Sequence, residues 1–229
     1  DANKNRAHLA VALAATDQLE EAQRIYDDLA KKHTDRDEFL ETTHFLAESA
    51  FEAGEKAWAR DLFTALADES NPAEFREKGL AGKAWCELDL QAPQRSAETF
   101  DRLLKDFPES SLVSQAALAR ATALDRINKP NEALAMYELV INEHSDSKQL
   151  PEAIFRFVKL HDNLQQDKQA EALMRRYVSE FPNQPNIDHA LYILAWVLID
   201  QRREADATEF FSRIHQQHKE SRYWADATL

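Results

Sequence analysis

The residue types that carry most enzyme and metal chemistry are few in this chain. It has eight histidines and a single cysteine, Cys86. Two pairs stand at helical spacing, His44 with Glu48 and His215 with His218, and each pair could share a metal ion. Residues three or four apart also face one another on any helix without a ligand. We therefore expect no metal site, and one cysteine allows no internal disulfide but only a buried, inert thiol.

Signatures of the common enzyme families are missing as well. The sequence contains no GxGxxG, no phosphate-binding loop, no GxSxG and no HExxH. Its three glycines leave little material for a glycine-built loop. We therefore expect a protein that is not an enzyme, with no catalytic residues, no cofactor and no small-molecule substrate.

Composition and charge exclude several further classes. Of the 229 residues 44% are hydrophobic, which is enough for a substantial core and excludes a disordered chain. The net charge of −13 argues against a nucleic-acid partner, which would need a basic face. Residues 38–74 alone hold nine acids against two bases, typical of a solvated face, with a docking surface for a basic partner as the alternative. The longest apolar run, residues 190–199, is half the length of a membrane span, so direct membrane insertion is not expected.

Residues of similar type recur along the chain with a period of 37. In each of six copies a small residue is followed, four positions later, by a large one. The small-residue column is Ala22, Ala59, Ser96, Ala133, Ala170 and Ala207, and the large-residue column is Tyr26, Phe63, Phe100, Tyr137, Met174 and Phe211. Two further columns keep the same phase, which indicates a repeat array.

Each copy has the periodicity of two helices. Ala22, Ile25, Tyr26 and Leu29 fall at i, i+3, i+4 and i+7 and form one apolar stripe, which a first helix precedes. No stretch alternates as a strand would, and one helix pair cannot cover its own apolar face, so neighbouring pairs must stack. The sequence therefore predicts an all-α solenoid in one repeat domain, residues 1–229. Its six helix–turn–helix repeats are expected at about 1–37, 38–74, 75–111, 112–148, 149–185 and 186–222, with the start of a seventh at 223–229.

The pattern resembles the tetratricopeptide repeat (TPR) family. Ala84, Ser96, Phe100 and Pro108 match the small, small, aromatic and closing-proline positions of that family, and the resemblance covers essentially the whole chain. It implies a right-handed superhelix of helix pairs that binds polypeptides. Here the period is 37 where the family has about 34. The position seven after the small residue is bulky here and small in the family, which predicts wider-spaced pairs and a changed superhelical pitch.

A finer resemblance concerns two short segments. FPNQP at residues 181–185 and DHALY at 188–192 are similar to the TPR-like repeats of bacterial outer-membrane-assembly lipoproteins and Tol–Pal coordinator proteins. This resemblance implies a bacterial protein of the periplasm or cell envelope, with the cytoplasm as the alternative.

First helices line the inner surface of a TPR solenoid, and two of their columns change chemistry from copy to copy. Positions that change in this way are free of common packing demands. We expect five of them to line a groove for a peptide or helix of a partner: Trp85, Phe155, Lys159, Tyr192 and Trp196. Aromatic side chains anchor many such contacts. The alternative is that Phe155 and Tyr192 only fill contacts between helices.

Two other features break the repeat pattern. Lys83, Glu87 and Arg120 stand in columns that are apolar elsewhere, and they form either a local ion network or a polar pocket in the central repeats. Trp58 stands in an otherwise polar second-helix column that should face solvent. It marks a possible outer contact site, for example with another domain of the same protein.

These observations predict a protein–protein interaction scaffold that binds a partner protein or peptide in its concave groove. Both ends interrupt the repeat, which indicates a fragment of a larger protein. Two alternatives stay open: a structural spacer within a larger multidomain protein, and an assembly subunit of a bacterial envelope complex. The Lys and Asn arrangement with which TPR clamps bind a C-terminal carboxylate is not found, so binding of chaperone tails is not expected.

Overall fold

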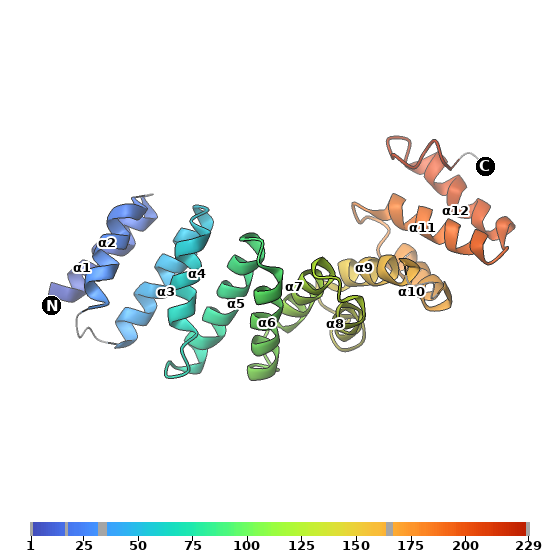
Figure 1. Ribbon diagram of the computed structural model, residues 1–229. Helices are drawn as coiled ribbons and strands as arrows, with labels where there is room; N and C mark the ends of the chain where they lie inside the picture. Colours follow the sequence, from blue (N-terminus) through green and yellow to red (C-terminus); the bar gives the residue numbers. More distant parts are fainter. Residues whose placement is uncertain (1, 17, 32–35, 164–166, 228–229) are drawn as a thin grey trace. The chain divides into compact units, whose positions relative to one another are not determined.

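A computed structural model of the protein describes residues 2–16, 18–31, 36–163 and 167–227 (Figure 1). These residues form twelve α-helices and no strand, so the predicted all-α class with six helix pairs is confirmed. The helices are α1 (Ala2–Ala15), α2 (Leu19–Leu29), α3 (Arg36–Glu52), α4 (Lys56–Leu66), α5 (Ala73–Asp89), α6 (Pro93–Asp106), α7 (Val113–Arg126), α8 (Pro130–Glu143), α9 (Leu150–Asn163), α10 (Asp167–Glu180), α11 (Ile187–Asp200) and α12 (Glu204–Gln217). Odd-numbered helices are the first members of the pairs, and even-numbered helices are the second members.

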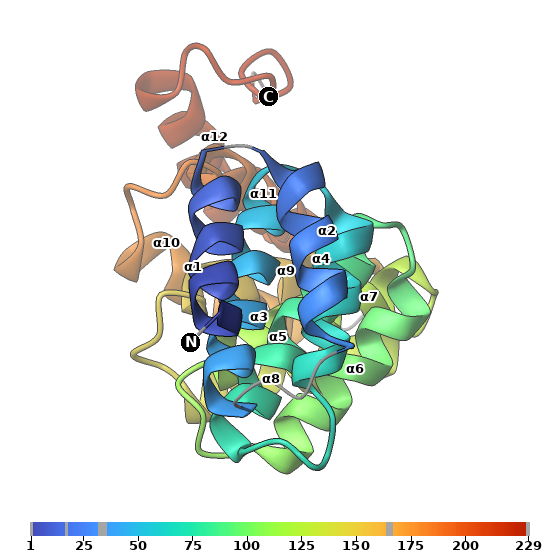
Figure 2. The same ribbon diagram turned by 90° about the vertical axis from the view of Figure 1, so that its left-hand side faces the viewer.

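The chain divides into two compact units, residues 1–129 (unit 1) and residues 130–229 (unit 2). In unit 1 the first helices form one layer, in which α1 contacts α3 and α3 contacts α5. Figure 2 looks along this layer, with α2 and α4 beside it. Second helices pack between the first helices that flank them in sequence, α4 between α3 and α5, and α6 between α5 and α7. In unit 2, α10 packs in the same way between α9 and α11.

The repeated columns form the cores of the two units. Described members of the small-residue column are at most 1% exposed, and members of the large-residue column at most 9%. The side chain of Ala170 lies outside the described residues. Ser96, the one polar member, donates its hydroxyl to the carbonyl oxygen of Ala84 at 2.9 Å, so its burial leaves no unpaired polar group.

The turn inside several pairs has one recurring conformation. Four residues at the same repeat position have a positive φ between 57° and 89°: Gly54, Gln91, Asn128 and Arg202. The next residue donates its N–H to the carbonyl five positions back, as Ala92 does to Glu87 at 2.8 Å. This is the Schellman helix end, in which glycine is favoured because it has no Cβ. In three of the four turns another residue occupies that conformation.

Two glycines allow α4 and α5 to approach closely. A Cβ at Gly79 would meet the backbone nitrogen of Ala67 and lie 2.8 Å from the carbonyl oxygen of Phe63. At Gly82 a Cβ would lie 2.5 Å from Cγ of the Phe63 ring. The missing side chains therefore bring this ring directly against α5.

The chain beyond α12 turns back without a regular helix. Residues 219–227 form consecutive turns, and the N–H of Ala227 bonds to the carbonyl of Tyr223 at 3.0 Å. The predicted start of a seventh repeat is thus described over residues 223–227 as one helical turn, and residues 228–229 lie outside the described residues. In the described part of the chain no helix has the length and apolar character needed to cross a membrane.

Candidate functional site

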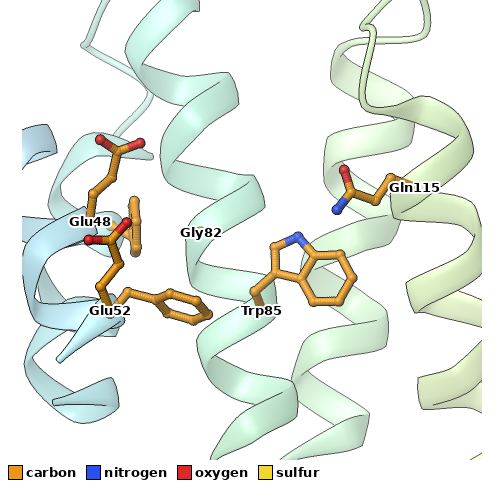
Figure 3. A pocket seen from close by; sticks show the side chains of 7 residues that line it. Glu48, Glu52, Gly82, Trp85 and Gln115 are labelled. Carbon is orange, nitrogen blue, oxygen red and sulfur yellow. The ribbon is translucent and has the colours of Figure 1, made fainter. Parts of the chain in front are cut away.

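Unit 1 has an open pocket of about 490 Å³ on its layer of first helices. Its lining residues come from α3, α5 and α7, with one ring from α4: Glu48, Phe51, Glu52, Phe63, Gly82, Trp85 and Gln115. Figure 3 shows the two glutamates of α3 on one side of Gly82, Trp85 beside it on α5, and Gln115 of α7 reaching toward the indole. We call this site the Trp85 pocket.

Helix geometry explains why these side chains meet. Glu48 and Glu52 are one turn apart on α3, so both carboxylates leave the same face of that helix. Gly82 and Trp85 are three residues apart on α5, which places the bare backbone of Gly82 next to the indole. The indole is half-buried and is held edge-on by the ring of Phe100, with centroids 5.2 Å apart and an interplanar angle of 80°. Trp85 therefore has a fixed base and a face left open to the pocket.

The pocket carries negative charge, and none of its seven lining residues is basic. The side chain of Glu48 is 58% exposed, and its carboxylate lies 3.3 Å from Nε2 of His44. Burial lowers the pKa of His44 by more than Glu48 raises it, so the imidazole is neutral at neutral pH. Lys56 lies over the Phe51 ring, 3.0 Å from its centroid, and its ammonium is paired with Asp89 at 3.3 Å. The pocket therefore combines two carboxylates with no basic side chain among its lining residues.

A second hollow, of about 390 Å³, lies between α1 and α3 on the same layer. Its lining residues are Lys4, His8, Val11, Glu38, Glu41, Thr42 and Phe45. Phe45 is 37% exposed and stands three residues before Glu48 on α3. The two hollows together form what we call the first-helix surface of unit 1.

The other four residues expected in the groove lie in unit 2, and the structure gives them different environments. Lys159 and Trp196 are exposed, the latter by 39%, and Tyr192 is half-buried. Phe155 is buried, 5.1 Å from His189 between ring centroids. Phe155 therefore fills a contact between α9 and α11, which is the alternative role that the sequence left open.

Ring contacts bring three of these residues into one aromatic cluster of unit 2. His189 links Phe155 to Tyr223, on which it stacks at 4.9 Å, and Tyr223 stacks on Tyr192 at 4.5 Å. Trp196 meets Tyr192 edge-on at 6.1 Å. Tyr192 and Trp196 form the more open end of this cluster, and the role of the five residues in binding stays a prediction.

The polar group of the central repeats divides into two parts. Lys83 and Glu87 line a pocket of about 490 Å³ together with Arg60, Asp61, Thr64, Arg95, Glu98, Thr99 and Arg102. Glu87 is 4% exposed, and its carboxylate accepts the hydroxyl of Thr99 at 2.7 Å. Arg120 does not line this pocket, and its guanidinium lies 2.8 Å from a carboxylate oxygen of Asp101. Lys83 and Glu87 therefore line a polar pocket, as one of the two alternatives predicts, whereas Arg120 pairs with an aspartate that the sequence did not indicate.

Trp58 lies on α4 and is half-buried, although its column was expected to face solvent. The indole packs against the hydrophobic core around Ala22 and Leu62 because α2 and α3 supply apolar neighbours there. Its role as an outer contact site stays a prediction.

The histidines and the cysteine that could bind a metal or react have the following surroundings in the described residues. No group of three or more histidine, cysteine or acidic side chains in the described residues is arranged to hold a metal ion. His215 stacks on Trp224 at 4.5 Å. Cys86 is fully buried, and burial raises the pKa of its thiol to about 12, so it stays protonated and unreactive.

Four residues of the pocket were not expected as site residues from the sequence: Phe51, Phe63, which was expected only as a core position, Gly82 and Gln115. A signal for the pocket was available in the glycines. Two of the three, Gly79 and Gly82, stand three apart within a helical stretch, where glycine is unfavourable. Such a pair marks a close approach of another helix, and here the ring of Phe63 fills that approach.

Comparison with known proteins supports the fold. No protein-family model matches the chain, and no curated protein is significantly similar to it in sequence. Among solved structures, MamA from Desulfovibrio magneticus RS-1 superposes with a TM-score of 0.63 at 15% identity, over 80% of this chain and 97% of MamA. BtubC from P. vanneervenii gives 0.64 at 14% identity over 93% and 91% of the two chains. YrrB, described as a TPR protein with an unusual peptide-binding site, gives 0.63 at 15% identity over 81% and 90%. The chain therefore has a TPR-like solenoid fold.

Proposed function

We propose that this chain is a protein-interaction scaffold that holds a segment of a partner polypeptide on the first-helix surface of unit 1. The observation that carries the proposal is the Trp85 pocket, where aromatic rings and carboxylates from separate helices converge on one open cavity. A half-buried tryptophan on a rigid base is the kind of anchor that dominates protein interfaces. The structural neighbour YrrB, described as having a peptide-binding site, supports such a role for this fold.

Unit 2 offers a second contact area in the same proposal. Trp196 and Lys159 are exposed on first helices, and Tyr192 stands beside Trp196. We assign these three side chains to a further segment of the partner.

The spacer function is the alternative from another class. A spacer needs no exposed aromatic side chains on its first helices, whereas Phe45 is 37% and Trp196 39% exposed there. Phe45 lines the hollow beside the Trp85 pocket, and apolar side chains that gather in this way favour binding more than single exposed ones do. Without an assembled set of catalytic groups in the described residues, an enzyme activity is not part of the proposal.

The compartment that we propose is the bacterial cell envelope, on the resemblance of residues 181–192 to envelope assembly proteins. Fractionation of cells that carry an epitope-tagged full-length protein tests it. Recovery with the periplasmic or membrane fraction supports this location, and recovery with a cytoplasmic marker contradicts it.

Site-specific photocrosslinking in cells tests the binding function. A photoreactive amino acid replaces Gln115, an exposed residue of the Trp85 pocket, and in a matched variant it replaces Lys105, which is 72% exposed on α6 outside the pocket. We expect a discrete protein adduct at position 115 that is absent at position 105 and disappears when Trp85→Ala is added. Identical adduct patterns at both positions, or a pattern unchanged by Trp85→Ala, would contradict the proposal.

A further inference from the structure

The Trp85 pocket combines aromatic surface with two carboxylates and has no basic residue in its lining, although the ammonium of Lys56 lies over the ring of Phe51. Trp85 and two phenylalanines supply the rings, and Glu48 and Glu52 supply two carboxylates from one face of α3. An isolated apolar cavity would receive any hydrophobic side chain. The two carboxylates beside the indole restrict which side chains can bind. An acidic side chain would be repelled, and a purely apolar one would desolvate the carboxylates without replacing their hydrogen bonds to water.

Two basic residues of α4 and α5 are engaged by other acids. Lys56 pairs with Asp89 at 3.3 Å, and Lys78 pairs with Glu74 at 2.7 Å. His44 lies 3.3 Å from Glu48, and its burial favours the neutral form. The charge of the pocket is therefore available to a ligand.

The segment that contains the pocket's glutamates also has an excess of negative charge. Residues 38–74, which include most of α3 and all of α4, hold nine acids and two bases. Glu41 and Glu38 line the neighbouring hollow at Phe45, so that hollow has two carboxylates and one lysine, Lys4. By contrast, the pocket at Lys83 is lined by four basic and three acidic side chains, so an excess of carboxylates is not common to every pocket of unit 1.

We propose that the Trp85 pocket receives a basic side chain of the partner segment, and that arginine suits it better than lysine. The guanidinium stacks on the open face of the Trp85 indole and donates hydrogen bonds to the carboxylates of Glu48 and Glu52. Its planar fork of donors reaches two acceptors while it stacks, which a lysine ammonium cannot do. The partner segment that this surface recognises is therefore basic and amphipathic, with apolar side chains for the hollow at Phe45. This inference rests on the proposed binding function of the same surface.

A titration with a small probe tests the charge preference without knowledge of the partner. The indole N–H signal of Trp85 is assigned by its loss in Trp85→Phe, and N-acetyl-argininamide is added to the full chain. N-acetyl-citrullinamide, of nearly the same shape but without charge, is the matched probe. We expect the Trp85 signal to move with the arginine probe at concentrations at which the citrulline probe leaves it in place, and the response to weaken as salt is raised.

Variants of the chain separate this inference from the binding function. Glu48→Gln/Glu52→Gln keeps the shape of the pocket and should weaken binding of the arginine probe about fivefold, the size expected for two partly exposed ion pairs. Glu55→Gln/Glu69→Gln removes the same charge from exposed positions outside the pocket and should leave the affinity within about twofold. Equal responses to both probes, no response of Trp85 to either, or equal losses in both double variants would overturn the inference. Adducts at position 115 that depend on Trp85 but involve partner segments without basic residues would overturn it and leave the binding function standing.

Discussion

The close approach of α4 and α5 makes a sharp prediction about Gly79. A methyl group there would meet the backbone nitrogen of Ala67 and lie 2.8 Å from both the carbonyl carbon of Leu66 and the carbonyl oxygen of Phe63. Ordinary contacts between such atoms are about 3.5 Å. Backbone atoms cannot rotate away, so Gly79→Ala must push the two helices apart.

The magnitude follows from two opposing terms. Overpacking of a core costs about 1–3 kcal/mol, and the upper end applies because the obstacle is backbone. Alanine returns about 1 kcal/mol through its better helix propensity. We therefore expect Gly79→Ala to lower the free energy of unfolding by about 2 kcal/mol. With a urea dependence of about 2 kcal/mol per molar, the midpoint falls by about 1 M.

Urea unfolding followed by circular dichroism measures this change, with Gly82→Ala as the matched variant on the same helix. The obstacle at Gly82 is the ring of Phe63, a side chain that can turn, so the midpoint should fall less. Both variants gain the same helix propensity, which cancels in their difference. A midpoint for Gly79→Ala that equals or exceeds the wild-type value would refute the close approach that shapes the Trp85 pocket.

Four further outcomes are expected from local features. Gln91→Gly should raise the free energy of unfolding by about 1 kcal/mol in thermal or urea unfolding because φ is 58° there, and Gly54→Ala, at φ 89°, should lower it by a similar amount. Burial lowers the pKa of His161 in the folded protein, so the unfolded chain binds more protons and the free energy of unfolding should fall as the pH drops below about 6.5. His161→Gln should weaken this pH dependence. An unaltered pH profile in that variant would contradict the lowered pKa of His161. Cys86 should resist a thiol reagent at pH 8 in the native protein and react at once in urea, whereas rapid native labelling would contradict its burial. Arg203→Ala should lower the free energy of unfolding only slightly, because its ion pairs are exposed to solvent, and the loss should shrink at high salt.

The sequence predicts most of the fold because equivalent positions of the six repeats meet the same packing requirements. Small residues such as Ala22 and Ala133 recur where two helices touch, so their burial follows from the period alone. Glu48 and Trp85 stand 37 residues apart, at the same position of successive repeats, and both residues line one pocket.

The details of the site depend on neighbours that a column cannot specify. Phe155 and Tyr192 share a column, yet Phe155 is buried and Tyr192 is half-buried, because each first helix has different rings beside it. Arg120 pairs with Asp101 of α6. This pairing depends on how α6 and α7 pack and not on the spacing of the two residues in the sequence. Such contacts between helices require three-dimensional coordinates.

The most direct test of the central claim is the affinity of the chain for the partner segment recovered by crosslinking at position 115. Isothermal titration would compare wild type with Trp85→Ala and with Lys105→Ala, which removes an exposed side chain of α6 outside the pocket. We expect Trp85→Ala to weaken binding by about thirtyfold, the loss typical of a tryptophan anchor, and Lys105→Ala to leave it within about twofold. Equal affinities for wild type and Trp85→Ala, with both folded by circular dichroism, would contradict the claim that this pocket is where the partner binds.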